Sequence, residues 1–568
     1  MPARRLSRTV TQRATDPEPA GPPPPDPGDH RVHHPQRVGV SRRGMVATQH
    51  YHASDAGAQM LAAGGNAVDA AVAAAFALCV VEPAACGLGG QTMLLLHLAE
   101  EGRKLCLDGA TRAPNRTPPG ELARAAQLRG HRATTVPSTP AVLAYTLKHY
   151  GTKALAEVLA PAIRLAKEGY RVSPLQHHLT RRELKHLKSH SAGAFFLKDG
   201  KTPYAIGARL RQPILAQTLG RLAERGVEDF YQGGIAAAIH ADMVANDGLL
   251  RDDDLAQIPW PTERRPLATH FAHKRVFTFP PPGAGRTLIE ALNLLEQFPA
   301  AARDPDSPRG ALLLAHVIRR ANLDRADRPE DPALFAQELE LGEDITHVDY
   351  AKRVARRIKA RLLKGEGGSI KPVRRPRGGE TTHLSAMDAA GNVVALTQSI
   401  ERVYGSFTAS PELGFIYNNY MSAFEYQDIA HPYYLRPNAV PWASVAPTIV
   451  FRGQRPWLAV GSPGSERIVS AILQVLLRLE RGAAPLDAVE APRLHCSLTG
   501  KVALEASRMR DDIPRELARH GFEIDPRDPY SFYLGCVQLV LREDGDCIGV
   551  ADPRRDGSAA GPAAGPAD

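Results

Sequence analysis

Thr381 is the residue of this chain that is best placed to act as a nucleophile. It stands between the segment GEGGSIKPVRRPRGGE, whose glycines and prolines do not support a regular element, and the β-type run THLSAMD. A threonine hydroxyl needs a nearby base. Cleavage between Glu380 and Thr381 would supply one, because a free α-amino group titrates near ~7.7–8 and can accept the hydroxyl proton. The position indicates a self-cleaving, N-terminal threonine nucleophile, with an ordinary β-forming threonine as the alternative.

A second segment could stabilise the negative charge that forms when such a nucleophile attacks a carbonyl. The turn Gly461-Ser462-Pro463-Gly464-Ser465 precedes a helix that we expect to begin near Arg467. Unpaired N–H groups and the positive end of the helix dipole meet at such a turn, which suits an oxyanion. An ordinary helix start is the alternative. We expect His383, two residues after Thr381, to be a packed strand residue and not the general base.

The elements around these residues follow from the local pattern. THLSAMD and VVALTQSI are β-type runs joined by the turn AAGN, which predicts a hairpin. RPWLAV, the glycine-rich turn and ERIVSAILQVLLRLERG predict a strand, a turn and a helix. Residues 55–84 predict small-residue helices broken at Gly64-Gly65, residues 142–250 are largely helical, and 350–364 form an amphipathic helix. Strands and helices alternate in the C-terminal third, so the class is α/β or α+β.

Composition excludes several other classes of protein. The chain has 568 residues, 43% hydrophobic and 23% charged, and its net charge of +9 is spread without a basic patch typical of nucleic-acid binding. No cysteine lies in a CxxC pair, so we expect reduced core thiols and no structural zinc. The N-terminus lacks the apolar core of a secretion signal, and no segment has the length and apolarity of a membrane span. We therefore expect a soluble, cytoplasmic protein.

Motifs from Gly44 to Asp556 resemble those of the gamma-glutamyltransferase family of N-terminal nucleophile hydrolases. Many motifs in one shared order are not expected by chance. In the first part of the chain they are GMVAT, GGNAVDAAVA, GLGG at 87–90, the triple proline at 280–282 and ADR at 326–328, and in the second part TTHLSAMDAAGNVVALTQSIE, Asn418-Asn419, GSPGSERI, EAPRLH and ADPRRDG.

The resemblance implies a role for each residue that matches the catalytic motifs. Thr381 corresponds to the nucleophile released by cleavage after Glu380, and Ser399 to the hydroxyl that hydrogen-bonds this nucleophile. Gly464 and Ser465 occupy the positions whose backbone amides form the oxyanion hole. The second position is usually glycine in the family, and a serine amide can serve if its φ angle allows it.

The residues that would bind a γ-glutamyl group depart from the family pattern. Ala110 stands in place of the carboxylate-binding arginine, Ala423 in place of the acid that binds the amino group, and Ala443 in place of the first of two serines. Losing one buried charged contact costs roughly 1.5–3 kcal/mol, so the resemblance implies weak selection of γ-glutamyl groups. The polar residues left to bind substrate are Glu401, Arg112, Tyr420 and Ser444, and compensation by Arg112 and Glu401 is the alternative.

The resemblance implies an α+β fold, a four-layer αββα sandwich, without a metal or organic cofactor. We expect a disordered extension at 1–40, a large-subunit part at 41–380, a small-subunit part at 381–556 and a flexible tail at 557–568. The two fragments of the precursor would form a heterodimer that transfers an acyl group from a small amide or peptide to water or an amine. The alternatives are an acylase for non-glutamyl acyl amides, and a processed but catalytically silent homologue.

Overall fold

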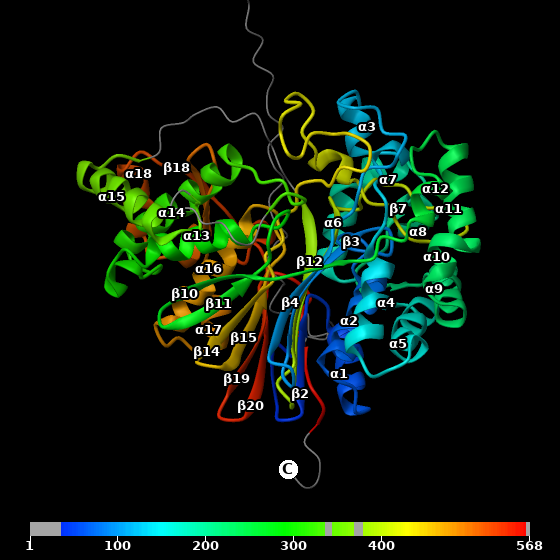
Figure 1. Cartoon of the computed structure of the whole chain (residues 1–568), viewed down its shortest axis with the longest axis horizontal. Helices are drawn as coiled ribbons and strands as arrows, with labels where there is room; N and C mark the ends of the chain where they lie inside the picture. The colour runs from blue at the N-terminus through cyan, green and yellow to red at the C-terminus, as the bar shows by residue number, and fades with distance from the viewer. Residues whose placement is uncertain (1–35, 336–343, 368–378, 564–568) are drawn as a thin grey trace, which may run out of the picture.

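Two antiparallel seven-stranded sheets lie face to face between two groups of helices, as Figure 1 shows. The computed structural model describes residues 36–335, 344–367 and 379–563. This arrangement confirms the predicted αββα sandwich. Most of the glycine-rich linker before Thr381 lies outside the described residues.

The first sheet, which we call the nucleophile sheet, contains the predicted hairpin at its centre. Strand β12 begins at Glu380 and pairs antiparallel with β13, and each also pairs with a strand from the first hundred residues of the chain. The predicted large and small parts therefore share one hydrogen-bonded sheet. Its order is β21 (Ser558–Ala560), β2 (Gly44–Thr48), β12 (Glu380–Asp388), β13 (Val393–Glu401), β3 (Gln91–Leu98), β4 (Arg103–Gly109) and β9 (Thr262–Arg264).

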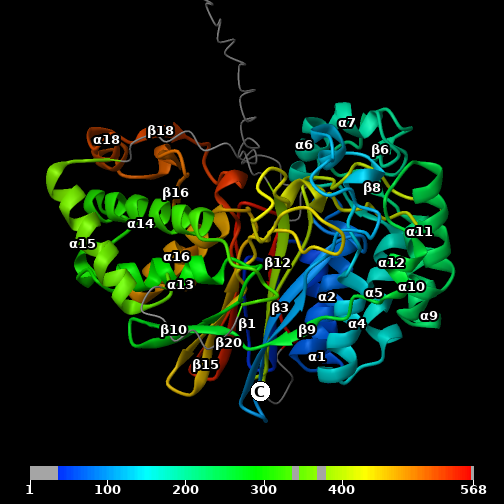
Figure 2. The same ribbon diagram turned by 45° about the horizontal axis from the view of Figure 1, so that its top comes forward.

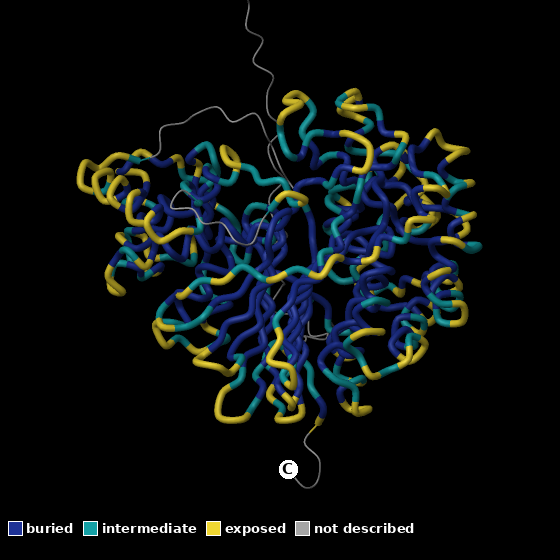
Figure 3. Tube along the Cα trace, in the orientation of Figure 1, coloured by how far each residue is buried: buried dark blue, intermediate teal, exposed yellow. Residues whose placement is uncertain are grey.

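The second sheet contains strands from both parts of the chain as well. Its order is β1 (Val38–Ser41), β20 (Asp546–Ala551), β19 (Gln538–Glu543), β15 (Arg455–Gly461), β14 (Thr448–Arg452), β11 (Lys274–Thr278) and β10 (Leu267–Phe271). Apolar side chains from the facing surfaces of both sheets pack into one layer, which includes Met45, Met93, Phe277, Met387 and Val540. Figure 3 shows this central layer as buried along both sheets.

Helices from the first half of the chain cover the nucleophile sheet, on the right in Figure 1. The innermost, α2, is buried along its whole length, because its many alanines allow the strands to approach closely. The sequence break at Gly64-Gly65 separates it from α1, as predicted. The layer consists of α1 (Tyr51–Ala62), α2 (Ala67–Val81), α3 (Arg124–Leu128), α4 (Thr139–Tyr150), α5 (Leu155–Glu168), α6 (Pro174–Arg182), α7 (Leu184–Lys188), α8 (Gly193–Phe196), α9 (Pro213–Arg225), α10 (Glu228–Gln232), α11 (Gly234–Ala245) and α12 (Asp252–Ala256).

A second group of helices covers the other sheet, as the tilted view in Figure 2 shows. A small sheet of β16 (Leu494–Cys496), β17 (Lys501–Leu504) and β18 (Glu523–Pro526) lies among them. The amphipathic helix predicted at 350–364 is α15, and the helix predicted after the glycine-rich turn is α16. The group consists of α13 (Gly285–Leu295), α14 (Pro308–Asp327), α15 (Val348–Lys364), α16 (Arg467–Glu480), α17 (Pro485–Glu490) and α18 (Asp512–Arg519).

The ordered fold includes part of each end that was predicted to be disordered. Strand β1 begins at Val38, inside the predicted 1–40 extension, and pairs with β20. Strand β21 lies inside the predicted 557–568 tail and pairs with β2. These boundaries were wrong because very short edge strands are stabilised by pairing with a neighbour and leave almost no periodic pattern. The cysteines are all buried and free, as predicted, and no helix among the described residues is long and apolar enough to cross a membrane.

Candidate active site

Thr381 lies at an irregularity in the pairing of β12 with β13. Glu380 pairs with Glu401 and Thr382 pairs with Gln398, so two residues of β13 face Thr381 alone. An irregularity of this kind changes the direction in which a side chain points. Glu401 has a φ of 78°, in the left-handed region, at the end of the same strand. The nucleophile candidate is therefore placed at the end of a buried hairpin, where the backbone leaves the regular ladder.

A path of hydrogen bonds joins Thr381 to the bond that precedes it. The Thr381 hydroxyl donates to Ser399 Oγ at 3.5 Å, and Ser399 Oγ donates to the carbonyl oxygen of Glu380 at 2.6 Å. The Glu401 N–H donates to Ser399 Oγ at 2.9 Å and holds that hydroxyl in place. The carbonyl that self-cleavage would attack is thus polarised by the residue that also contacts the attacking hydroxyl.

The glycine-rich turn lies at the start of α16, as predicted, and its backbone is in an unusual conformation. Gly464 has a φ of 118° and Ser465 a φ of 54°. The left-handed region costs a non-glycine residue roughly 1 kcal/mol, which explains why this position favours glycine. Within the described part of the chain, the N–H groups of Gly464 and Ser465 donate to no protein acceptor. They remain available to an oxygen anion beside Thr381.

One open pocket gathers most of the residues that the sequence singled out. Thr381, Glu401, Tyr420, Ser444 and Ser465 all line it. Ser399 lies behind Thr381 and acts through hydrogen bonds. The rest of the lining consists of Gly379, Arg402, Ser422, Ala423, Trp442 and Val445.

Arg112 is not part of this pocket. It lies in the loop after β4, and its backbone carbonyl accepts a hydrogen bond from the N–H of Val136. Ala110, on the same loop, packs against the apolar layer between the sheets. Ala423 does line the pocket, so a methyl group stands at the position where the resemblance predicts an acid. The structure therefore offers no support for compensation by Arg112.

Arg402 lines the pocket and was not identified from the sequence. Burial lowers the pKa of its guanidinium, and Arg124 and Arg129 act in the same direction. Its Nε has no hydrogen-bond partner among the described residues. The residue follows Glu401 at the end of β13, and its place directly after a predicted binding residue was the signal that could have revealed it.

Tyr420 closes the pocket on the side of the hairpin. Its side chain is buried, and burial raises the pKa of its hydroxyl, as does the nearby Glu401. The hydroxyl therefore stays protonated at any pH near neutrality and can act only as a hydrogen-bonding group. Tyr420 lines the pocket, and its role in binding substrate stays a prediction.

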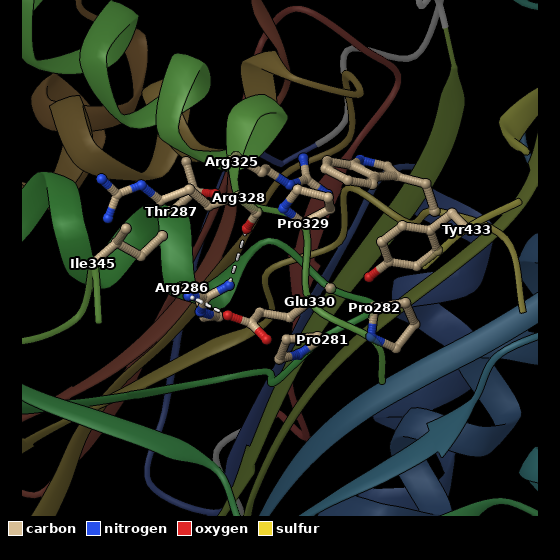
Figure 4. A pocket seen from close by; sticks show the side chains of 12 residues that line it. Pro281, Pro282, Arg286, Thr287, Arg325, Arg328, Pro329, Glu330, Ile345 and Tyr433 are labelled. Carbon is tan, nitrogen blue, oxygen red and sulfur yellow. Dashed lines mark hydrogen bonds and ion pairs between the residues drawn. The ribbon is translucent and has the colours of Figure 1, made fainter. Parts of the chain in front are cut away.

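A second arginine, Arg325, contacts the pocket wall from the helical layer over the second sheet. Arg325, near the end of α14, donates to Ser444 Oγ at 3.3 Å and to the carbonyl of Ala443. Its guanidinium stacks on Trp442, 4.3 Å from the ring centroid. Figure 4 shows Arg325 with Arg286, Arg328 and Tyr433 around a small neighbouring pocket, and Trp442 lines both pockets.

A buried ion network supports the strand beneath Thr381. Arg555 donates to the Thr381 carbonyl at 3.1 Å and forms ion pairs with Glu380 and Glu82. Glu82 also accepts from the Thr382 hydroxyl, and burial raises its pKa to about 7 from the ordinary 4.5. These contacts give the ADPRRDG motif a structural role next to the predicted cleavage point.

The rest of that motif belongs to a larger buried cluster. Arg554 pairs with Glu505 at 2.7 Å and with Asp552 at 3.0 Å, and Arg493 of the EAPRLH motif pairs with Asp552 at 2.5 Å. Removing one partner of such a cluster would leave a buried charge unpaired. The cluster therefore fixes the segment that carries Arg555.

His383 is a packed strand residue, as predicted. It is fully buried, its ring contacts Thr397 Oγ1 and Ser385 Oγ, and it packs against Gly461 with no room for a side chain there. Burial lowers the pKa of its imidazole to about 3, so the ring is neutral near pH 7, and His383 is not among the described residues that line the pocket.

Comparison with known proteins agrees with the geometry of this site. A family model described as gamma-glutamyltranspeptidase matches residues 53–562. The chain is 31% identical over 549 residues to a glutathione hydrolase proenzyme of Escherichia coli (strain K12), covering 92% of each. It is 32% identical over 546 residues to an acylase ACY 1 proenzyme of Pseudomonas sp. (strain V22), covering 92% of this chain and 94% of that one. A solved cephalosporin acylase from Bacillus halodurans superposes with a TM-score of 0.83 at 28% identity, over 95% of this chain and 99% of that one.

Proposed function

Since this chain belongs to the gamma-glutamyltranspeptidase family, we propose that it cuts itself between Glu380 and Thr381 and then uses Thr381 on small amides whose acyl group lacks a free α-amino group. Membership makes it an amide hydrolase or acyltransferase of the N-terminal nucleophile type. The proposal concerns the bond that is cleaved, the roles of individual residues and the identity of the acyl group. One observation carries it: Thr381 shares a hydrogen-bond path with Ser399 and the Glu380 carbonyl at the edge of a pocket.

Maturation begins with attack of Thr381 Oγ on the carbonyl carbon of Glu380. Ser399 is placed to donate to the carbonyl oxygen as it gains negative charge. The C–N bond then breaks, the hydroxyl proton passes to the nitrogen, and an ester joins Glu380 to Thr381 Oγ. Water hydrolyses this ester and leaves a carboxylate on Glu380 and a free amino group on Thr381.

Turnover repeats the same attack on an external amide. The α-amino group of Thr381 takes the hydroxyl proton, and the amides of Gly464 and Ser465 hold the oxyanion. The proton then goes to the departing amine, and water or an acceptor amine attacks the acyl-enzyme. The resulting fragments, 1–380 and 381–568, would stay together as a heterodimer, because β2 pairs with β12 and β3 pairs with β13 across the proposed cut.

The lining of the pocket supports a shift away from γ-glutamyl groups. Glu401 is the only acid among the described residues that line it, and Ala423 offers no charge to an ammonium group. Because recognition of a polar group needs a buried partner that the wrong substrate leaves unpaired, we expect glutathione to be a poor substrate. The named similarity to acylases favours a non-glutamyl acylase as the more specific form of this proposal.

The test is a comparison of kcat/KM on the purified, cleaved protein. Glutathione and γ-glutamyl-p-nitroanilide are compared with p-nitroanilides of acyl groups that have no α-amino group. We expect the second set to be turned over faster. A value above ~10⁴ M⁻¹s⁻¹ for glutathione, typical of efficient enzymes, would overturn the proposed specificity. A cleaved protein inert towards every amide would instead support the silent homologue.

A further inference from the structure

The small pocket of Figure 4, which we call the arginine pocket, lies beside the N-terminus of α13. Among the described residues, its lining contains three arginines (Arg286, Arg325 and Arg328) and one acid, Glu330. Neither Thr381 nor any other residue assigned to catalysis lines it, and Trp442 is the one described residue that it shares with the Thr381 pocket. It is therefore a separate site, for which the amide chemistry has no use.

The N-terminus of α13 is buried but carries no cap from the described residues. Ala284 precedes the helix and offers no side-chain acceptor, and the first turn contains no acid. Within the described part of the chain, the backbone N–H groups of Gly285, Arg286 and Thr287 donate to no protein acceptor. Such donors need a partner when the helix end is buried, and the positive end of the helix dipole favours an anion as that partner.

Two side-chain donors in the first turn of α13 are buried without a partner as well. Thr287 is 1% exposed and Arg286 is 7% exposed. Neither Thr287 Oγ1 nor Arg286 Nε has a hydrogen-bond partner among the described residues, and both residues line the arginine pocket. A buried donor that stays unpaired costs free energy. One acceptor with several oxygens, placed in this pocket, would satisfy both.

The charges around the pocket favour an anionic acceptor. Arg286 uses Nη2 for its ion pairs with Asp344 at 3.0 Å and Glu330 at 3.1 Å, so these acids do not reach its Nε. Arg328 stacks on Tyr350, 5.1 Å from the ring centroid, and pairs with no acid in the described ranges. The side chain of Glu330 is 39% exposed, so it can turn towards solvent when another anion enters.

We propose that the arginine pocket binds a small oxyanion. Arg286 Nε, the Thr287 hydroxyl and the first N–H groups of α13 would hold it, and Arg328 would add positive charge. An oxyanion fits better than a halide, because donors from a helix end and from two side chains need several acceptor atoms. This inference goes beyond the proposed function and does not depend on cleavage or on turnover.

Calorimetry with inorganic phosphate tests the site on the full-length Thr381→Ala chain, purified without phosphate or sulfate. The reference titration uses sodium chloride at equal ionic strength. We expect one phosphate to bind per chain with a Kd of about 1 mM or below. No saturable binding, or chloride bound as tightly as phosphate, would overturn the inference.

Thr287→Val is the decisive variant, because valine keeps the size and shape of threonine and removes only the hydroxyl. It should raise the Kd for phosphate about 10- to 100-fold, as expected for a lost hydrogen bond to a charged group. Its stability in phosphate-free buffer should not fall, since the hydroxyl has no protein partner to lose. A Kd equal to that of the parent chain would refute the site.

Two further variants control for charge and for burial. Thr134→Val is the matched control, because the Thr134 hydroxyl is also buried without a partner among the described residues but does not line the arginine pocket. Its Kd should equal that of the parent chain. Glu330→Gln should lower the Kd about two- to fivefold, since it removes a partly exposed competing charge. Weaker binding in Thr134→Val, or in Glu330→Gln, would contradict the assignment.

Tryptophan fluorescence locates the bound anion independently. Trp442 lines the arginine pocket, and the guanidinium of Arg325 stacks on its ring at 4.3 Å from the centroid. Phosphate should change the fluorescence with the same Kd that calorimetry gives. The change should disappear in Trp442→Phe and persist in Trp260→Phe, since Trp260 does not line this pocket. The opposite result would place the anion elsewhere and refute the inference.

Discussion

The hydroxyl of Ser399 donates a hydrogen bond of 2.6 Å to the carbonyl oxygen of Glu380. This contact exists in the uncut chain, before any substrate can bind. Ser399 is therefore placed to act twice, first on the chain's own peptide bond and later on the nucleophile that cleavage releases. The same residue links maturation to turnover, and both steps can be measured in one variant.

Ser399→Ala should slow self-cleavage and turnover without unfolding the protein. The variant loses a hydrogen bond to a developing negative charge, worth roughly 1.5–3 kcal/mol, which is about a 10- to 100-fold lower rate. The appearance of the two fragments on a denaturing gel over time measures the first effect. Ser399→Thr keeps the hydroxyl and should remain close to wild type. Cleavage of Ser399→Ala at the wild-type rate would show that Ser399 is only a strand residue.

Thr381→Ala should remain a single chain, because it has no hydroxyl with which to attack Glu380. The wild type should give two fragments, the smaller of which begins with Thr381 in N-terminal sequencing. Thr381→Ser is the matched variant and should still cleave, since it retains the nucleophilic oxygen. A wild-type chain that stays intact for days in solution would contradict the proposed maturation.

Ser465→Gly should stabilise the protein by up to about 1 kcal/mol, because glycine adopts the left-handed conformation at a φ of 54° without steric cost. Turnover should change by no more than a few fold, since the backbone N–H is retained. Denaturant unfolding of both proteins in a Thr381→Ala background measures the difference on an uncut chain. A large loss of turnover in Ser465→Gly would show that the serine side chain, and not its amide, contributes to the site.

Glu82 should make stability depend on pH. Burial raises its pKa to about 7, so the folded protein binds a proton that the unfolded chain releases near pH 4.5. The stabilisation is complete below about pH 4.5 and is lost as pH rises through 7, by at most about 3 kcal/mol. The measurement is the unfolding free energy of the Thr381→Ala protein minus that of the same protein with Glu82→Gln. A difference that is constant between pH 5 and 8 would contradict the raised pKa.

Ala423→Asp should improve γ-glutamyl substrates. Ala423 lines the pocket with Thr381, so an aspartate there would offer an ammonium group a charged partner. We expect kcat/KM for γ-glutamyl-p-nitroanilide to rise about tenfold, and more if Ala110→Arg is added and fits beside the apolar layer. Ala423→Asn is the uncharged control and should have little effect. If the ratio of kcat/KM for γ-glutamyl substrates to kcat/KM for des-amino acyl substrates stayed unchanged, residue 423 would not contact the α-amino group.

The sequence predicted the central hairpin, the turn before α16 and the αββα layers, because each depends on a local pattern or on a shared set of motifs. The grouping of Thr381 with Glu401, Tyr420, Ser444 and Ser465 in one pocket followed from the same resemblance. The cations were harder to place. Arg112 stands two residues after Ala110, close enough along the chain to suggest that it replaces the missing arginine, but its loop does not bring it to the pocket.

Arg325 and Arg402 show why the remainder could not be predicted. Arg325 is more than a hundred residues from Ser444 along the chain, and only the packing of α14 against the 442–444 segment brings the two together. Arg402 looks like one of many surface arginines in the sequence, and its burial depends on the irregular end of β13. Contacts of this kind depend on tertiary packing, which leaves no periodic pattern in either segment.

Because both fragments contribute strands to the nucleophile sheet, maturation changes the kind of equilibrium that governs unfolding. Strands β2 and β3 belong to the proposed larger fragment and flank β12 and β13 of the smaller one. Before the cut, unfolding is a unimolecular event within one chain. After it, unfolding releases two separate chains, so mass action enters and the melting temperature should rise with protein concentration. The mature protein would then be least stable when dilute, while the Thr381→Ala precursor would melt at one temperature at every concentration.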